Sequence, residues 1–214
     1  MIAMELLRGL VGPSDEKGRI YGVVVGVVTN NSDPEGLERV RVRFPWLNDD
    51  DESNWARMAA PMAGKDRGFY YLPEVGDEVL VAFEHGAVDF PFILGALWNG
   101  KDNPPETNSD GQNNHRTIKS RSGHIIRFDD SDGGEKIEIL DKNKNKIVIS
   151  SSDDTLTIES RSDISIKSST GKLKLGGVGV EISSQADVKI EADLTMDVKA
   201  AAMLSIQGAM VKIN

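Results

Sequence analysis

The sequence contains no cysteine among its 214 residues, which excludes disulfide bridges and thiolate metal sites. Long hydrophobic runs are also absent, and none approaches the roughly 18 to 20 residues that a membrane-spanning helix needs. The opening MIAMELLRGLVG lacks the extended apolar core of a signal peptide. We therefore expect a chain that is synthesised in the cytoplasm without a membrane anchor.

The chain has no basic cluster, and its formal net charge is -9. Residues 1–136 carry 15 Lys and Arg against 23 Asp and Glu, whereas residues 137–214 carry 10 against 11. Binding to a phosphate backbone depends on clustered Lys and Arg that release counterions. We expect no nucleic-acid partner.

Apolar residues in the second half of the chain recur in pairs at positions i and i+2. The first pair is Ile137 and Ile139, and later pairs follow at steps of 7 to 10 residues, with a mean close to eight. Residues two apart on a strand point to the same face, so each pair predicts a short strand with one dry side. The pairs expected to form the core of a needle are Ile147/Ile149, Leu156/Ile158, Ile164/Ile166, Leu173/Leu175, Val180/Ile182, Val188/Ile190, Met196/Val198, Leu204/Ile206 and Val211/Ile213.

A small residue follows these pairs two positions later, where a corner would bring the backbone too close to an axis for a larger side chain. The Ala-rich stretch at 200–204 keeps the same register, so we expect strand there despite its helix propensity. The predicted corners are Ser151, Ser160, Ser168, Gly177, Ser184, Ala192, Ala200 and Gly208.

Two architectures fit this repeat: a solenoid formed by one chain, or a prism in which several chains intertwine. The 78 residues from 137 to 214 would give a single chain only a few rungs with little interior. Three chains that share each layer would bury every apolar pair against copies of itself and leave no open edges. We favour an intertwined homotrimer that forms a triple-stranded β-helix.

The front of the chain reads as short strands separated by turns, at 20–29, 37–44, 55–62, 68–72, 77–84 and 90–98. Such a series in about 80 residues predicts a small antiparallel barrel or sandwich. The turn-forming string NGKDNPPETNSDGQNN marks a linker. We therefore divide the chain into an N-terminal arm (1–19), a barrel domain (20–98), a linker and transition (99–136) and the needle (137–214).

Four strings of the barrel region resemble the oligonucleotide/oligosaccharide-binding (OB) barrel of contractile-tail spike proteins. They are RVRVRFPW (39–46), NWARMAAPMAG (54–64), GFYYLPEVGDEVLVAFEHG (68–86) and FPFILGALWNG (90–100). The string NNHRTIKSRSGHIIRFDD (113–130) resembles the stretch that follows that barrel. The relevant families are the phage baseplate assembly protein V group and the VgrG spikes of type VI secretion.

This resemblance implies an all-β chain whose OB barrel leads into a trimeric β-helix. It implies a structural spike that punctures membranes at the tip of a contractile injection system or phage tail, with only transient contact to the target membrane. The hub-like region of VgrG spikes is missing, so a separate hub protein would bind on the N-terminal side. The alternative function is a trimeric binding module that uses the OB barrel to hold a carbohydrate or an effector cargo.

The sequence offers no catalytic site, cofactor site or metal site. Only about 35 residues separate Gly100 from Lys136, too few for a glycosidase site of the kind that some relatives carry at this point. The last histidine is His124, so the iron-binding His-x-His tip of certain phage needles is excluded. The needle end then requires a cap against edge pairing, and the resemblance implies a PAAR-type tip protein there.

Other possible sites have simpler structural explanations. The acidic run Asp49-Asp50-Asp51-Glu52 lacks the ligand spacing of a calcium loop and is expected to be a solvated turn. GGVG at 176–179 is expected to be a strand corner rather than a nucleotide cradle. The three histidines, His85, His115 and His124, do not have the spacing of zinc ligands. The three tryptophans, Trp46, Trp55 and Trp98, are expected to serve packing rather than sugar stacking.

Overall fold

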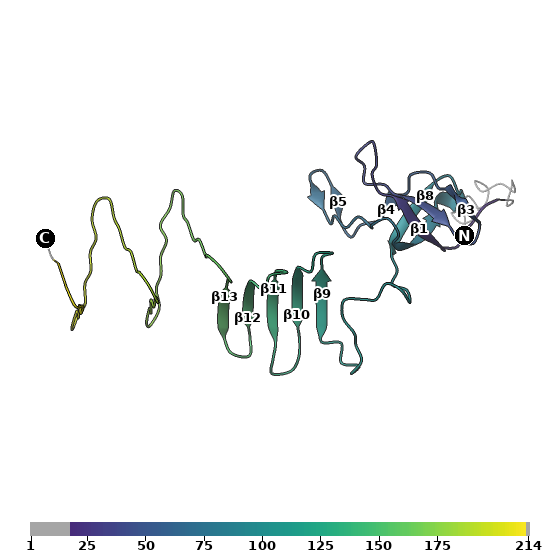
Figure 1. Cartoon of the computed structure of the whole chain (residues 1–214). Helices are drawn as coiled ribbons and strands as arrows, with labels where there is room; N and C mark the ends of the chain where they lie inside the picture. The colour runs from purple at the N-terminus through teal and green to yellow at the C-terminus, as the bar shows by residue number, and fades with distance from the viewer. Residues whose placement is uncertain (1–17, 213–214) are drawn as a thin grey trace, which may run out of the picture. The chain divides into compact units, whose positions relative to one another are not determined.

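The computed structural model describes residues 18–212, except for the side chains of residues 48–51. The described residues form β-strands and turns with one short 3-10 helix, η1 (Glu84–Gly86), which confirms the predicted all-β class. The chain divides into two units, residues 1–161 and 162–214 (Figure 1). No helix in the described part is long and apolar enough to cross a bilayer.

The first unit begins with a six-stranded sheet whose order is β3-β2-β1-β7-β8-β4. Strand β1 lies at its centre and pairs antiparallel with both β2 and β7. A separate two-stranded hairpin, β5 with β6, is inserted between β4 and β7. The strands are β1 (Val24–Asn30), β2 (Arg41–Phe44), β3 (Asn48–Glu52), β4 (Arg57–Met58), β5 (Ala63–Gly64), β6 (Arg67–Gly68), β7 (Glu78–Phe83) and β8 (Pro91–Ala96).

This sheet closes on itself between Val40 and Ala56. The two residues exchange backbone hydrogen bonds of 3.0 and 2.7 Å, which join the start of β2 to the start of β4 at the far edge of the sheet. The closed sheet surrounds one apolar core, because alternate residues of β2 and β7 point inward. The buried residues are Val28, Val40, Val42, Phe44, Ala56, Val79, Val81, Phe83 and Ile93.

The PEVGD string forms the tight turn that leads into β7. Gly76 adopts a φ of 99°, which favours glycine, and its N–H donates to the Val28 carbonyl at 2.8 Å. The Asp77 carboxylate accepts the Glu74 N–H at 2.8 Å and closes the turn from the other side. This turn therefore fixes where β7 begins beside β1.

The acidic run that we expected to be a turn lies in β3, which differs from the prediction. Arg43 of β2 is paired in register with Glu52 at the end of this strand. β3 is an edge strand, and charged residues are common on edge strands because they discourage pairing with other chains. The turn lies instead at residues 45–47, between β2 and β3.

A second sheet follows in the first unit, with the order β13-β12-β11-β10-β9 and every pair antiparallel. It is a simple meander of five-residue strands, drawn side by side in Figure 1. The sheet starts at His115, within the segment assigned to the linker and transition. Its strands are β9 (His115–Lys119), β10 (Ile125–Asp129), β11 (Lys136–Leu140), β12 (Lys146–Ser150) and β13 (Thr155–Glu159).

The second unit contains no strand within its described residues, 162–212. Figure 1 shows it as extended runs that reverse direction at intervals, without strand arrows. Its bends begin at residues 169, 177, 185, 193, 201 and 209, always eight residues apart. The backbone therefore follows the spacing of the sequence repeat although no neighbouring strand is present.

Candidate functional site

The sheet β9–β13 has one face made almost entirely of apolar side chains. The strand register places the side chains of this face in two cross-strand columns. Aligned apolar neighbours on one face of a sheet stabilise the pairing of its strands. The columns are Ile118–Ile126–Ile139–Ile147–Ile158 and Phe128–Ile137–Ile149–Leu156.

This apolar face has no cover among the described residues. Its nine side chains remain between 37 and 64% exposed, and no buried residue belongs to this sheet. Exposed apolar surface this continuous marks a contact site in soluble proteins. The side chains of this face are of the kind that normally lies in a protein core, but no second layer of described residues packs on them.

The opposite face of the same sheet is mostly polar and carries several ion pairs, although Ile125, Leu140 and Val148 also lie on it. Arg127 Nη2 lies 2.7 Å from Glu106 Oε1, and its Nη1 lies 3.4 Å from Glu138 Oε2. Lys136 contacts Glu138 at 3.4 Å, and Lys146 contacts Glu159 at 3.1 Å. The paired face is therefore suited to solvent, and the apolar face is the one suited to contact.

Glu106 fastens the linker onto this polar face. Its carboxylate accepts the Thr117 hydroxyl at 2.8 Å and the Arg127 Nε at 3.0 Å, and it lies 3.4 Å from His115 Nδ1. These contacts, with the Thr117 hydrogen bond foremost, hold the pKa of Glu106 below its ordinary value. Similarly, the Ser131 hydroxyl and backbone N–H lower the pKa of Asp129. Both carboxylates therefore stay ionised at neutral pH.

Sequence reasoning missed this polar network and the first part of the apolar face. Ile118, Ile126 and Phe128 extend the face beyond the needle boundary drawn at residue 137. The signal was present in the alternation of HRTIK and HIIRFD, which has the same period of two as the later strands. The linker glutamate carried no comparable signal, because its contacts depend on the path of an irregular segment.

The predicted core residues fall into two groups. Ile147, Ile149, Leu156 and Ile158 lie on the apolar face of β12 and β13. Ile213 lies outside the described residues. The remaining predicted core residues lie on the second unit and are exposed, for example Ile164 at 54% and Ile166 at 63%. The others are Leu173, Leu175, Val180, Ile182, Val188, Ile190, Met196, Val198, Leu204, Ile206 and Val211.

Each predicted corner lies in a turn or bend or directly before one. Ser151 follows β12, and Ser160 follows β13, where its hydroxyl donates to Asn145 Oδ1 at 3.3 Å. Gly177 begins a bend, and the other five lie one residue before a bend: Ser168, Ser184, Ala192, Ala200 and Gly208. The placement of small residues thus coincides with the reversals of the backbone.

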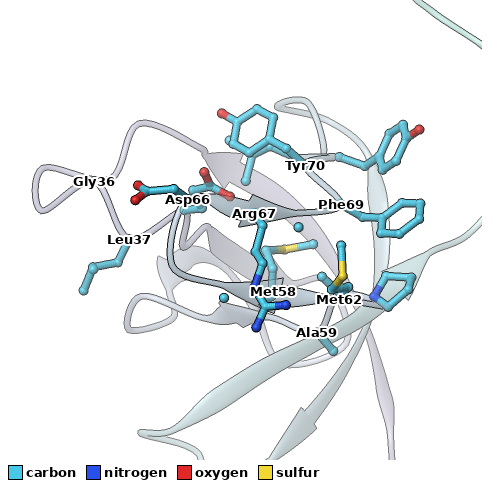
Figure 2. Close-up of a pocket in the computed structure, with 17 residues that line it drawn as sticks. Gly36, Leu37, Met58, Ala59, Met62, Asp66, Arg67, Phe69 and Tyr70 are labelled. Carbon is cyan, nitrogen blue, oxygen red and sulfur yellow. The ribbon is translucent and has the colours of Figure 1, made fainter.

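The barrel domain carries a separate groove beside the β5–β6 hairpin, with a volume of about 640 Å³. Figure 2 shows Met58 and Met62 in this groove beside the Arg67 side chain, with Phe69 and Tyr70 along its rim and Leu37 at one end. The charged residues of its lining, Glu38, Asp66 and Arg67, are all exposed.

The tryptophans have different surroundings. Trp55 is partly buried, and the Arg41 guanidinium lies 4.9 Å from its ring centre. Trp46 packs against Phe44 at 5.9 Å but remains 52% exposed, and Trp98 is 70% exposed. The three indoles therefore do not share one packing role.

The histidines do not converge. His85 lies in η1, His115 lies between two carboxylates, and His124 precedes β10. Across residues 18–212, outside the undescribed side chains at 48–51, no group of three His, Asp or Glu lies close enough together to hold a metal ion.

Comparison with known proteins identifies the barrel. Residues 24–98 match the family model described as the type VI secretion system/phage-baseplate injector OB domain. The chain is similar to VgrG spike proteins over part of its length. It is 29% identical over 144 residues to the type VI secretion system spike protein VgrG1a of Pseudomonas aeruginosa, which covers 62% of this chain and 22% of that protein.

Two further relatives give similar values. The type VI secretion system spike protein VgrG1c of Pseudomonas aeruginosa is 30% identical over 134 residues, with 58% of this chain and 18% of that protein covered. The actin cross-linking toxin VgrG1 of Vibrio cholerae is 29% identical over 136 residues, with 56% of this chain and 12% of that protein covered. The chain thus spans less than a quarter of the length of each of these relatives.

Proposed function

We propose that this chain is the structural spike at the tip of a contractile injection system or phage tail, and that it works as a homotrimer. The observation that carries this proposal is the uncovered apolar face of β9–β13, followed directly by a tail whose apolar pairs have no partners in the described chain. Both features are incomplete in one copy. The names of two of the relatives, which are type VI secretion spike proteins, support the spike role.

In the trimer, three copies of the β9–β13 face turn toward a common axis and cover one another. Each copy supplies one wall, and the polar faces with their ion pairs remain in water. In the tail, the extended runs of the three chains pair with one another. This pairing satisfies backbone N–H and C=O groups that a single extended chain leaves to water.

The mechanical role follows from that construction. A ladder of inter-chain hydrogen bonds around a dry core resists bending, because bending would break several bonds in one layer together. The spike then transmits thrust into the target envelope and contacts its membrane only in passing. No catalytic residue takes part in this function.

The proposed partners lie at the two ends of the spike. A hub protein of the baseplate binds on the side of the barrel domain and joins it to the tube. A PAAR-type tip protein caps the far end, where the strand edges of the last layer would otherwise pair with other chains. The spike is then part of an assembled particle.

The molar mass of the purified full-length chain tests the trimer. We expect multi-angle light scattering to give three times the 23.3 kDa of one chain, and the trimer to persist on detergent gels without heating. A monodisperse monomer with a folded barrel would refute the trimeric spike and favour the binding-module alternative.

The location of the chain is tested separately with gold-labelled antibodies against the barrel. These antibodies should mark only the tip of intact particles, and labelling along the tube would contradict the proposed location.

A further inference from the structure

The barrel domain carries an apolar depression at the start of β1 that the spike role does not use. Its four lining residues are all apolar: Ile20, Val24, Val25 and Trp46. We call this depression the β1 patch. Ile20 and Val24 also pack against the buried core, whereas Val25 is 38% exposed and Trp46 52% exposed. The β1 patch is therefore a continuation of the core that the described residues leave open to water.

The aromatic residues of the barrel lead from the core to the same patch. Phe44 packs on the buried Phe83, with ring centres 5.8 Å apart, and on Trp46, with ring centres 5.9 Å apart. Trp46 is thus the outer member of a row of rings that begins in the core. Covering an indole and its aliphatic neighbours removes much apolar surface from water, so the group that covers this patch should itself be apolar.

The described part of the chain begins beside this patch. Ile20 lines the patch, and its N–H donates to the Gly86 carbonyl at 2.9 Å. Arg19 forms a β-bridge with Ala87, and its Nη1 donates to the His85 carbonyl at 3.2 Å. These contacts fix the point at which the preceding segment joins the barrel. The segment before Gly18 is therefore tethered next to the β1 patch.

Residues 1–17 lie outside the described residues, but their sequence has the pattern of an apolar stripe. Apolar residues recur at positions i, i+3, i+4 and i+7, the spacing of one face of a helix. They are Ala3, Leu6, Leu7 and Leu10. Glu5 and Arg8 fall away from this face, and Gly12-Pro13 is a typical helix stop. A helix this short is marginal in water without a surface to pack on.

The tether is long enough for this stripe to reach the patch of its own chain. Eight residues separate Val11 from Ile20, and an extended chain of that length spans up to about 25 Å. A short tether also gives the segment an effective concentration on the order of millimolar at the patch. The same chain is therefore favoured over a separate copy as the source of the covering segment.

We propose that residues 3–11 form a short amphipathic helix that packs its apolar stripe on the β1 patch of the same chain. The helix closes the open end of the barrel core, and the core surface in turn stabilises the helix. This contact lies within one chain and does not depend on the trimer, so each copy of the spike carries its own.

Photo-crosslinking in the full-length chain tests this contact. We would replace Leu7 by p-benzoylphenylalanine, irradiate the purified protein and map the products by mass spectrometry. We expect crosslinks within one chain that join position 7 to residues 20–25 or 44–47. Glu5 has nearly the same tether but lies on roughly the opposite side of the helix, so the same probe at position 5 is the matched control.

Three results would overturn the proposed docking. One is an equal yield of patch crosslinks from positions 5 and 7, since a tethered but undocked segment would give it. Another is a set of crosslinks from position 7 that avoids the patch. The third is a product of doubled chain mass on denaturing gels with its crosslink at the patch, because it would show that the segment of another copy lies there.

Cysteine labelling gives a second readout without a bulky probe in the segment. The chain contains no cysteine, so Val25→Cys introduces one thiol in the β1 patch. A segment that is undocked for a tenth of the time or less should slow the reaction of this thiol with iodoacetamide about tenfold or more. Adding Leu6→Glu and Leu10→Glu should remove that protection, and an unchanged labelling rate would contradict the proposal. Val75→Cys is the control, since Val75 is 61% exposed and lies outside the patch.

The light-scattering mass separates this proposal from the spike role. A monomer in which the thiol at position 25 is protected would refute the trimeric spike and retain the docked segment. A trimer in which that thiol reacts freely would overturn the docked segment and leave the spike role intact.

Discussion

Val148 and Ile149 are adjacent in β12, so their side chains lie on opposite faces of the sheet. Ile149 lies on the apolar face between Ile137 and Leu156, and Val148 lies on the opposite face beside Glu138 and Thr157. We propose the variants Ile149→Lys and Val148→Lys. Both variants replace a β-branched residue that favours strands, and differences in strand propensity span only about 1 kcal/mol of stability in host proteins.

The magnitude follows from the exposure of Ile149, which is 47% in the single chain. Full burial of an isoleucine contributes about 1.5 to 3 kcal/mol, so covering the remaining half contributes roughly 0.7 to 1.4 kcal/mol per copy. Three copies lose about 2 to 4 kcal/mol of association free energy, or roughly 30-fold to 1000-fold in the assembly constant. Three unpaired ammonium groups moved into the interior add a desolvation cost of several kcal/mol each.

Sedimentation velocity across a concentration series measures this effect. We expect Ile149→Lys to shift the protein toward monomer at concentrations where the parent chain is fully assembled. Val148→Lys should assemble normally, because its ammonium stays in water near the Glu138 carboxylate. If Ile149→Lys assembled as tightly as the parent, or if both variants were equally impaired, the reasoning that this face is covered by other copies would be wrong.

Three further predictions concern other parts of the chain. Ala192→Trp should lower the yield of detergent-resistant trimer by overpacking a corner, whereas Glu191→Ala, at the neighbouring outward position, should not. Hydrogen bonds from Arg39 lower the pKa of Asp33 in the folded protein. The ionised carboxylate therefore stabilises the fold above about pH 4, and this stabilisation is lost as the pH falls through the pKa of the folded state. Asp33→Asn should lower Tm at pH 7, and the difference in Tm between variant and parent should narrow on acidification. Gly26→Val should lower the barrel Tm, since even a Cβ there would lie 3.3 Å from two valines of neighbouring strands, whereas Gly95→Val, with open space around it, should cost less in a thermal scan.

The all-β class and the spacing of the repeat were predictable from the sequence because they depend on periodicity. The alternation of arginine with apolar residues in RVRVRF is of this kind, and its apolar members Val40, Val42 and Phe44 are all buried. The octad spacing predicted reversals every eight residues, and the bends of the second unit have that spacing. Patterns of this kind reflect which face of a strand is dry, so they survive without knowledge of the tertiary contacts.

Other features could not be predicted in this way. The acidic run at β3 has the composition of a turn, but backbone pairing to β2 makes it an edge strand. Glu106 accepts hydrogen bonds from Thr117 and Arg127, which lie 11 and 21 residues away in the sequence. No local sequence pattern predicts such a contact. What covers the apolar face of β9–β13 cannot be predicted from the pattern of one chain, because no described residue of this chain covers it.

The regular bends of the second unit have a consequence for how the length of this tail can change. Each bend begins eight residues after the one before, so a deletion or duplication of eight residues leaves every small residue next to a bend. A change of four residues would move apolar wall positions to the bends and small residues to the walls. The length of the tail can therefore evolve, or be engineered, in steps of eight residues, because each such step keeps the register of apolar and small residues.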